Sequence, residues 1–229
     1  MKLILFDIDG TLISSGGAGL RAMVRTLERR FGIVNGFDGV PTAGRLDPLI
    51  LADALAAAGR PGLDAAALDA FRAEYCDLLR EELATTPIER QRVLPGVRVL
   101  LDDLAGRDVA VALLTGNFET SAFIKLQHFA LAPYFAFGAF GEDASSRSAL
   151  LPIAIDRARQ RGHAVDGPSD VLVIGDTPHD VDCAHEWGAT ALAVATGSFD
   201  RDALSATGAR IVVEDLSDSA PVHRWLGGA

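Results

Sequence analysis

The sequence has few cysteines, few lysines and no long apolar segment. Only Cys76 and Cys183 occur in the 229 residues. Two cysteines cannot build a disulfide framework or a cysteine zinc site, and they fit a reducing cytoplasm. The apolar run at residues 3–6 is followed by two aspartates within three positions. It is too short for a signal sequence or a membrane-spanning helix. We therefore expect a cytoplasmic protein without a membrane partner.

Positive charge is also scarce. The formal net charge is −10, which argues against a nucleic-acid partner. Lys2 and Lys125 are the only lysines, so lysine chemistry is excluded from most of the chain. An anionic substrate is still possible, provided that local cations oppose the acidic field.

The pattern of apolar segments is typical of an α/β protein. Continuous apolar segments alternate with helical ones, which favours a parallel sheet covered on both faces. We predict strands at 3–6, 109–114, 135–140, 171–174, 191–195 and 211–213, and helices at 96–104, 118–129, 145–162 and 177–187. Trp187 and Trp225 are interpreted as packing residues.

Residues 18–85 follow a different pattern. Three apolar stripes at helical spacing occur there without a strand between them. This predicts a Rossmann-like, doubly wound core of residues 1–14 and 86–229, interrupted by a small α-helical domain of residues 15–85.

An acidic pair follows the first predicted strand. Asp7 and Asp9 are two residues apart, so both carboxylates can face the crevice at the carboxyl end of a parallel strand. Gly10 permits a sharp turn, and Thr11 supplies a hydroxyl. Such a pair suits acid–base chemistry or a hard cation. Taken alone, the same pattern also occurs in ordinary turns.

Polar groups follow two further strands. Thr115, Gly116 and Asn117 come after residues 109–114, where a hydroxyl and backbone N–H groups can bind an anion or simply cap a helix. Asp176 and Asp180 come after residues 171–174. Helix capping explains each of these acids singly, but not why a third strand end also delivers acid to the crevice.

These three segments, in this order, resemble the haloacid dehalogenase-like hydrolase superfamily, in its phosphatase branch and with a helical cap in the C1 position. The resemblance covers almost the whole chain and rests on Asp7-x-Asp9-Gly10-Thr11-Leu12, Leu114-Thr115-Gly116-Asn117 and Gly175-Asp176-x-x-x-Asp180.

The resemblance implies Mg²⁺-dependent hydrolysis of a phosphate ester through an aspartyl-phosphate. Asp7 would be the nucleophile and Asp9 the general acid and base. The metal would be held by Asp7, Asp176 and the backbone carbonyl of Asp9, with Asp180 ordering the metal shell or its waters.

The phosphoryl oxygens would be bound by Thr115, Gly116, Asn117 and a cation. The family usually has a lysine for this purpose, whereas this chain has Arg147 at the corresponding position. Arginine keeps the charge and can bind phosphate with two hydrogen bonds. Lys125 is the alternative, although its place on a helix is more typical of a solvated charge, and Arg147 itself could be a surface residue.

The predicted substrate is a small phosphorylated metabolite of the phosphoglycolate or sugar-phosphate class. The segment from Gly44 to Pro48 resembles a cap segment of phosphoglycolate-phosphatase-like members, so Arg45 could contact an anionic leaving group or simply be a solvated arginine. Asp9 disfavours dehalogenation, since a halide leaving group needs no proton. Phosphonate hydrolysis needs a cap lysine, which residues 13–90 lack.

Two alternatives stay open: a phosphosugar mutase resembling β-phosphoglucomutase, and a non-catalytic protein that binds a phosphorylated ligand. Either a monomer or a homodimer is compatible with the sequence.

Overall fold

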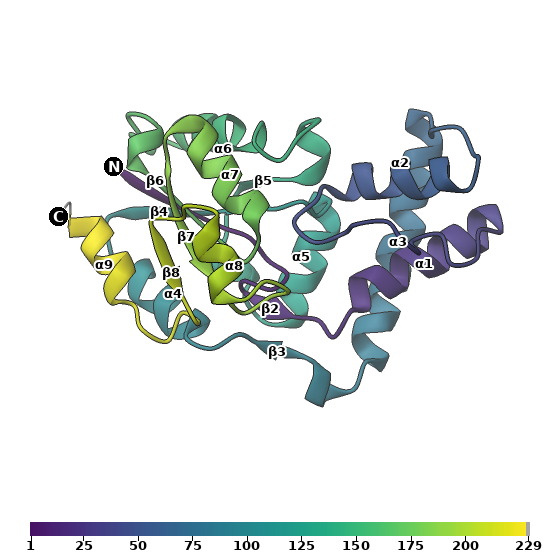
Figure 1. The fold of residues 1–229 in the computed structure, drawn as a ribbon, viewed down its shortest axis with the longest axis horizontal. Coiled ribbons are helices and arrows are strands. Elements are labelled where there is room, and N and C mark those ends of the chain that lie inside the picture. Colours follow the sequence, from purple (N-terminus) through teal and green to yellow (C-terminus); the bar gives the residue numbers. More distant parts are fainter. Residues whose placement is uncertain (228–229) are drawn as a thin grey trace.

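A computed structural model describes residues 1–227, and its centre is a six-stranded, entirely parallel sheet (Figure 1). The strand order is β5-β4-β1-β6-β7-β8. The strands are β1 (Lys2–Phe6), β4 (Val109–Leu114), β5 (Gly138–Ala139), β6 (Val171–Gly175), β7 (Thr190–Val194) and β8 (Ile211–Val213). The expected parallel sheet is confirmed, although β5 is shorter than the strand predicted at residues 135–140.

The central strands are buried because helices cover both faces of the sheet. Alternate residues of β1 belong to two separate apolar clusters, Ile4 and Phe6 to one and Leu3 and Leu5 to the other. One cluster includes residues of α4 (Val97–Ala105), α5 (Glu119–His128) and α9 (Ala220–Gly227). The other includes residues of α6 (Leu150–Gln160), α7 (Pro178–Trp187) and α8 (Arg201–Ala206). This is the doubly wound arrangement expected from the sequence.

A helical unit is inserted between β1 and α4. It consists of α1 (Ala18–Phe31), α2 (Asp47–Ala57) and α3 (Ala65–Thr85). Figure 1 shows these helices grouped beside the sheet, with α5 of the core next to α3. The chain leaves the core through β2 (Ile13–Ser14) and returns to it through β3 (Arg92–Val93). These two short strands pair with each other in an antiparallel ribbon. The ribbon was not predicted, because two-residue strands leave no periodic pattern.

Other details differ from the prediction. The helix expected at 145–162 begins only at Leu150, because residues 144–149 form an irregular segment that carries Arg147. Trp187 was interpreted as a packing residue, yet it is 41% exposed, and its indole N–H donates to the Ser148 carbonyl at 2.8 Å. Trp225 does pack against the core. No helix within residues 1–227 combines the length and the apolar character needed to cross a bilayer.

Candidate active site

The candidate site lies where β1 and β6 end side by side. After β1 the chain passes through the helical unit and α4 to β4, which pairs with β1 on one side. After β6 the chain passes through α7 to β7, which pairs with β6 on the opposite side. Such a reversal leaves a crevice at the carboxyl ends of the strands, the usual ligand site of open parallel sheets. Asp7 directly follows β1, and Asp176 directly follows β6.

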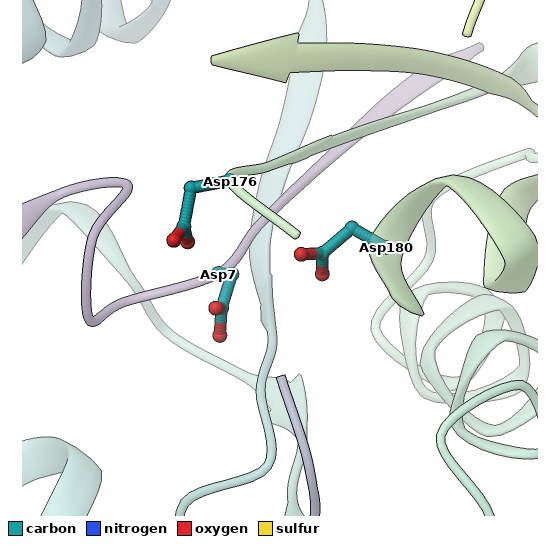
Figure 2. Close-up of side chains that lie close together, drawn as sticks. All are labelled: Asp7, Asp176 and Asp180. Atoms are coloured by element: carbon teal, nitrogen blue, oxygen red, sulfur yellow. The ribbon is translucent and has the colours of Figure 1, made fainter. Parts of the chain in front are cut away.

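Three carboxylates converge in this crevice. Asp7, Asp176 and Asp180 each present an oxygen within 4.8 Å of the others, and Figure 2 shows the three side chains close together. The Thr11 hydroxyl donates to Asp176 at 3.0 Å. Asp180 accepts from the backbone N–H and the hydroxyl of Thr177 at the start of α7, at 3.1 and 2.8 Å. Side chains and a helix start therefore hold this acidic cluster in place.

The acidic cluster is electrostatically costly by itself. Burial raises the pKa of Asp7, and the carboxylates of Asp180 and Asp9 raise it further, while Arg147 lowers it. Burial likewise raises the pKa of Asp176, as do its neighbours Asp7 and Asp180. The donor set consists of hard oxygen atoms, which suit a small divalent cation. A cation bound there would offset the repulsion that raises both pKa values.

Arg147 lies inside the site and is not a surface residue. Its guanidinium contacts Asp7 at 3.2 Å and donates to Asp180 and to the Leu114 carbonyl, the latter at 3.2 Å. Burial alone would lower the pKa of Arg147, but Asp180 and Asp7 hold it above the usual value. Its Nε is buried without a hydrogen-bond partner in the part of the chain that the structure describes.

Lys125 is also in the site, and its interpretation as a solvated charge was wrong. The side chain is buried on α5, where its ammonium group donates to Asp9 at 2.5 Å and to the Asn117 side-chain oxygen at 2.6 Å. Periodicity could not show this, because the residue that Lys125 meets belongs to a distant strand end.

The loop after β4 lies beside Asp9 and completes this side of the site. The Asn117 amide donates to Asp9 at 3.0 Å and to the Thr115 hydroxyl at 2.8 Å. Gly116 passes so close to the helical unit that an added Cβ would lie 2.0 Å from the Arg45 carbonyl oxygen. The structure thus brings Thr115, Gly116 and Asn117 together with Asp9, as the predicted site requires.

Asp47, at the start of α2, is a site residue that the sequence analysis missed. Its backbone N–H donates to the Gly116 carbonyl at 2.7 Å, and its carboxylate accepts from the Phe118 N–H at 3.0 Å. Burial raises the pKa of Asp47 to about 7, although Lys125 lowers it. In the sequence, an acid just before Pro48 predicts a helix start. That pattern gives no indication that Asp47 contacts the loop after β4.

A cavity of about 490 Å³ joins these groups to the helical unit. Asp7, Asp9, Asp176, Lys125 and Arg147 line its core side. The helical unit contributes both polar and apolar walls, among them Ser14, Ser15, Leu20, Met23, Thr42, Arg45, Asp47, Ile50 and Tyr75. Arg45 also lines the cavity, and its guanidinium lies 2.7 Å from Asp53.

A family model described as haloacid dehalogenase-like hydrolase matches residues 1–188. The chain belongs to that family. A phosphoglycolate phosphatase of Rhodospirillum rubrum is 28% identical over 227 residues, which is 99% of this chain and 91% of the relative. The resemblance seen in the sequence motifs is therefore confirmed at the family level.

Two solved structures have a similar fold. A structure from Haemophilus somnus, described as a predicted phosphoglycolate phosphatase, matches with a TM-score of 0.69 and 19% identity, over 97% of this chain and 98% of that one. The β-phosphoglucomutase of Clostridium difficile matches with a TM-score of 0.74 and 15% identity, over 99% and 97%. At these identities the similarity concerns the fold alone.

Proposed function

We propose that this hydrolase is a Mg²⁺-dependent phosphatase that acts on a small phosphomonoester through an aspartyl-phosphate intermediate. The observation that carries the proposal is the separation of the two acids after β1. Asp7 faces the acidic cluster and Arg147, whereas Asp9 faces Lys125 and Asn117. One acid is thus placed for attack beside a cation site, and the other for proton transfer.

The residues present fit Mg²⁺. Asp7 and Asp176 would hold the ion, together with the backbone carbonyl of Asp9, and Asp180 would support them. The bound ion would neutralise the carboxylates and polarise the phosphoryl group. Arg147 is not a substitute for that ion, since one guanidinium faces three carboxylates.

The chemistry divides between Asp7 and Asp9. The Asp7 carboxylate would attack phosphorus, which forms the acyl phosphate as the ester oxygen leaves. Asp9 would give its proton to that leaving oxygen and then remove one from the water that hydrolyses the intermediate. Asp9 suits this work because its side chain is 41% exposed toward the cavity, although Lys125 and Asn117 fix its direction.

The remaining groups would stabilise the transferring phosphoryl group. Arg147 supplies a fixed positive charge next to Asp7, and Thr115 and Asn117 offer a hydroxyl and an amide beside Asp9. Donors held in place before the reaction stabilise developing charge most effectively. Helices α1–α3 would act as a cap that shields the site from water. The phosphoglycolate phosphatase relatives support this reading.

The test is a panel of phosphate esters, including p-nitrophenyl phosphate, 2-phosphoglycolate and β-glucose 1-phosphate. We expect hydrolysis that requires Mg²⁺ and is lost in Asp7→Asn, which keeps the side-chain shape but removes the nucleophile. Absence of metal-dependent turnover on every ester would refute the phosphatase assignment. Conversion of β-glucose 1-phosphate to the 6-phosphate would make the enzyme a mutase instead.

A further inference from the structure

The cavity has two chemically different ends. The phosphoryl end holds Asp7, Asp9 and Asp176, and the opposite end is formed by the helical unit. Apolar side chains dominate part of that second end: Met23 and Ile50 are buried there, Leu20 is 43% exposed, and the buried Tyr75 adds an aromatic ring. In a phosphatase, the leaving alcohol would occupy this end, because Asp7 fixes where the phosphorus lies.

The cationic side chains that line the cavity already have acidic partners. Within residues 1–227, three cationic side chains line it: Arg45, Lys125 and Arg147. Lys125 and Arg147 contact Asp9, Asp7 and Asp180 at the phosphoryl end. Both also lie against the inserted segment, since the Lys125 ammonium group is next to Gly19 of α1 and Arg147 donates to the Gly44 carbonyl at 3.3 Å, but each is already paired with an acid of the core.

Arg45 is the cavity cation that the inserted segment itself supplies, and it is paired with Asp53. Arg45 lies two residues before α2 and Asp53 lies within that helix, with Nη2 of Arg45 2.7 Å from the Asp53 carboxylate. Nη1 of Arg45 also donates to the Pro41 carbonyl at 3.2 Å. Binding a substrate carboxylate would require Arg45 to leave both partners.

Asp47 makes this end still less suitable for an anion. Its buried carboxylate lines the same cavity and is fixed there by the Phe118 N–H. Because burial raises the pKa of Asp47 to about 7, its carboxylate form predominates above that pH, and a substrate carboxylate would then meet a like charge in a partly desolvated space, where repulsion is stronger than in water. A neutral hydroxyl would meet no such cost, and it could donate to the Asp47 carboxylate.

From this arrangement, and on the basis of the proposed phosphatase function, we infer that the substrate's leaving alcohol is uncharged and carries an apolar face. Phosphate esters of neutral alcohols fit this class, whereas phosphoglycolate, whose leaving group bears a carboxylate, does not. The volume of about 490 Å³ lies in the range of pockets for small organic ligands, roughly 300–1,000 Å³, so it accepts a group larger than two carbons.

A matched pair of substrates tests the charge requirement. 2-Hydroxyethyl phosphate and 2-phosphoglycolate have the same length and differ in a neutral hydroxymethyl against a carboxylate. With wild-type enzyme and saturating Mg²⁺, we expect kcat/KM to be at least tenfold higher for 2-hydroxyethyl phosphate. Equal or faster turnover of 2-phosphoglycolate would overturn the inference. Benzyl phosphate should have a lower KM than 2-hydroxyethyl phosphate, and a higher KM would contradict the apolar face.

Variants of Asp53 and Arg45 test whether their ion pair causes the preference for an uncharged leaving group. Asp53→Asn releases Arg45, so kcat/KM for 2-phosphoglycolate should rise at least fivefold while that for 2-hydroxyethyl phosphate stays the same. The double variant Asp53→Asn with Arg45→Gln should lose the gain. If Arg45→Gln alone selectively weakens 2-phosphoglycolate turnover, Arg45 already binds the carboxylate and the inference is wrong. Failure of every ester to turn over would instead refute the phosphatase function itself.

Discussion

At the scale of single residues, the site depends on which charged group each acid faces. Asp7 and Asp9 are two positions apart, yet Asp7 contacts Arg147 and Asp9 contacts Lys125. The proposed replacement of the family's usual lysine by Arg147 therefore does not leave the site short of a cation. Within residues 1–227, two cationic side chains are buried, one beside each acid.

We expect Lys125→Ala to lower kcat on the order of 10²-fold, because Asp9 and Asn117 lose the group that orients them. Arg147→Ala should lower kcat more, since Asp7 and Asp180 then lose their shared partner. Steady-state kinetics on p-nitrophenyl phosphate would measure both. Lys2→Ala, which removes the other lysine far from the site, is the control. Wild-type kcat in Lys125→Ala would contradict the assigned role.

Asp47 makes stability depend on pH. Its pKa is raised from 3.8 to about 7 by burial. Its contribution to stability is therefore complete below the unfolded value and is lost as the pH rises through the folded value. Asp47→Asn removes this dependence. The variant should gain about 2–3 kcal/mol in free energy of unfolding relative to wild type between pH 5 and 8, as measured by urea denaturation. A constant difference across that range would show that Asp47 does not titrate as described.

At the scale of elements, the site is built from the turns that follow strands. Each of β1, β4 and β6 ends in a polar segment, and each segment is fixed by neighbours that are distant in sequence. The segment before α2 is held against the turn after β4, because Asp47 bonds both Gly116 and Phe118. The helical unit is therefore anchored to the loop after β4.

Gly116→Ala tests this anchoring. The new methyl group would meet the Arg45 carbonyl at 2.0 Å, so the two segments would have to separate. We expect kcat/KM to fall at least tenfold, because a displacement of this size near the reacting groups misplaces Asn117 and the cap. Gly106→Ala is the matched control, since its nearest atom lies at an ordinary 3.6 Å. Equal kinetics for the two variants would argue against the contact.

Element positions were largely predictable, but irregular parts were not. The apolar runs located the buried strands at both ends of the chain, since continuous apolar residues satisfy a strand covered on both faces. Residues 144–149 escaped prediction because their conformation follows from the contacts of Arg147 with Asp7 and Asp180. No local pattern encodes such a contact.

At the scale of the whole molecule, the acidic cluster opposes folding until a cation binds. The sheet and α7 bring Asp7, Asp176 and Asp180 within 4.8 Å of one another only in the folded chain. A cation that binds this cluster binds the folded state selectively and must stabilise it.

Mg²⁺ at about 100 times its dissociation constant should add about 2.7 kcal/mol of stability. For a chain of this length, the midpoint of thermal unfolding should rise by about 5–10 °C. Calorimetry with Mg²⁺ and with EDTA measures the difference, and Asp176→Asn should abolish most of it. An equal response in that variant would place the ion elsewhere.

The sequence by itself determined the alternation of strands and helices, the place of the helical insertion, and the acids after β1 and β6, because apolar periodicity and strand-end motifs are local properties. Only the tertiary structure decided that Lys125 faces Asp9, that Asp53 engages Arg45, and that Asp47 lines the cavity. These contacts join residues from different elements, and burial and charge pairing between such residues arise only when the sheet and the helical unit come together.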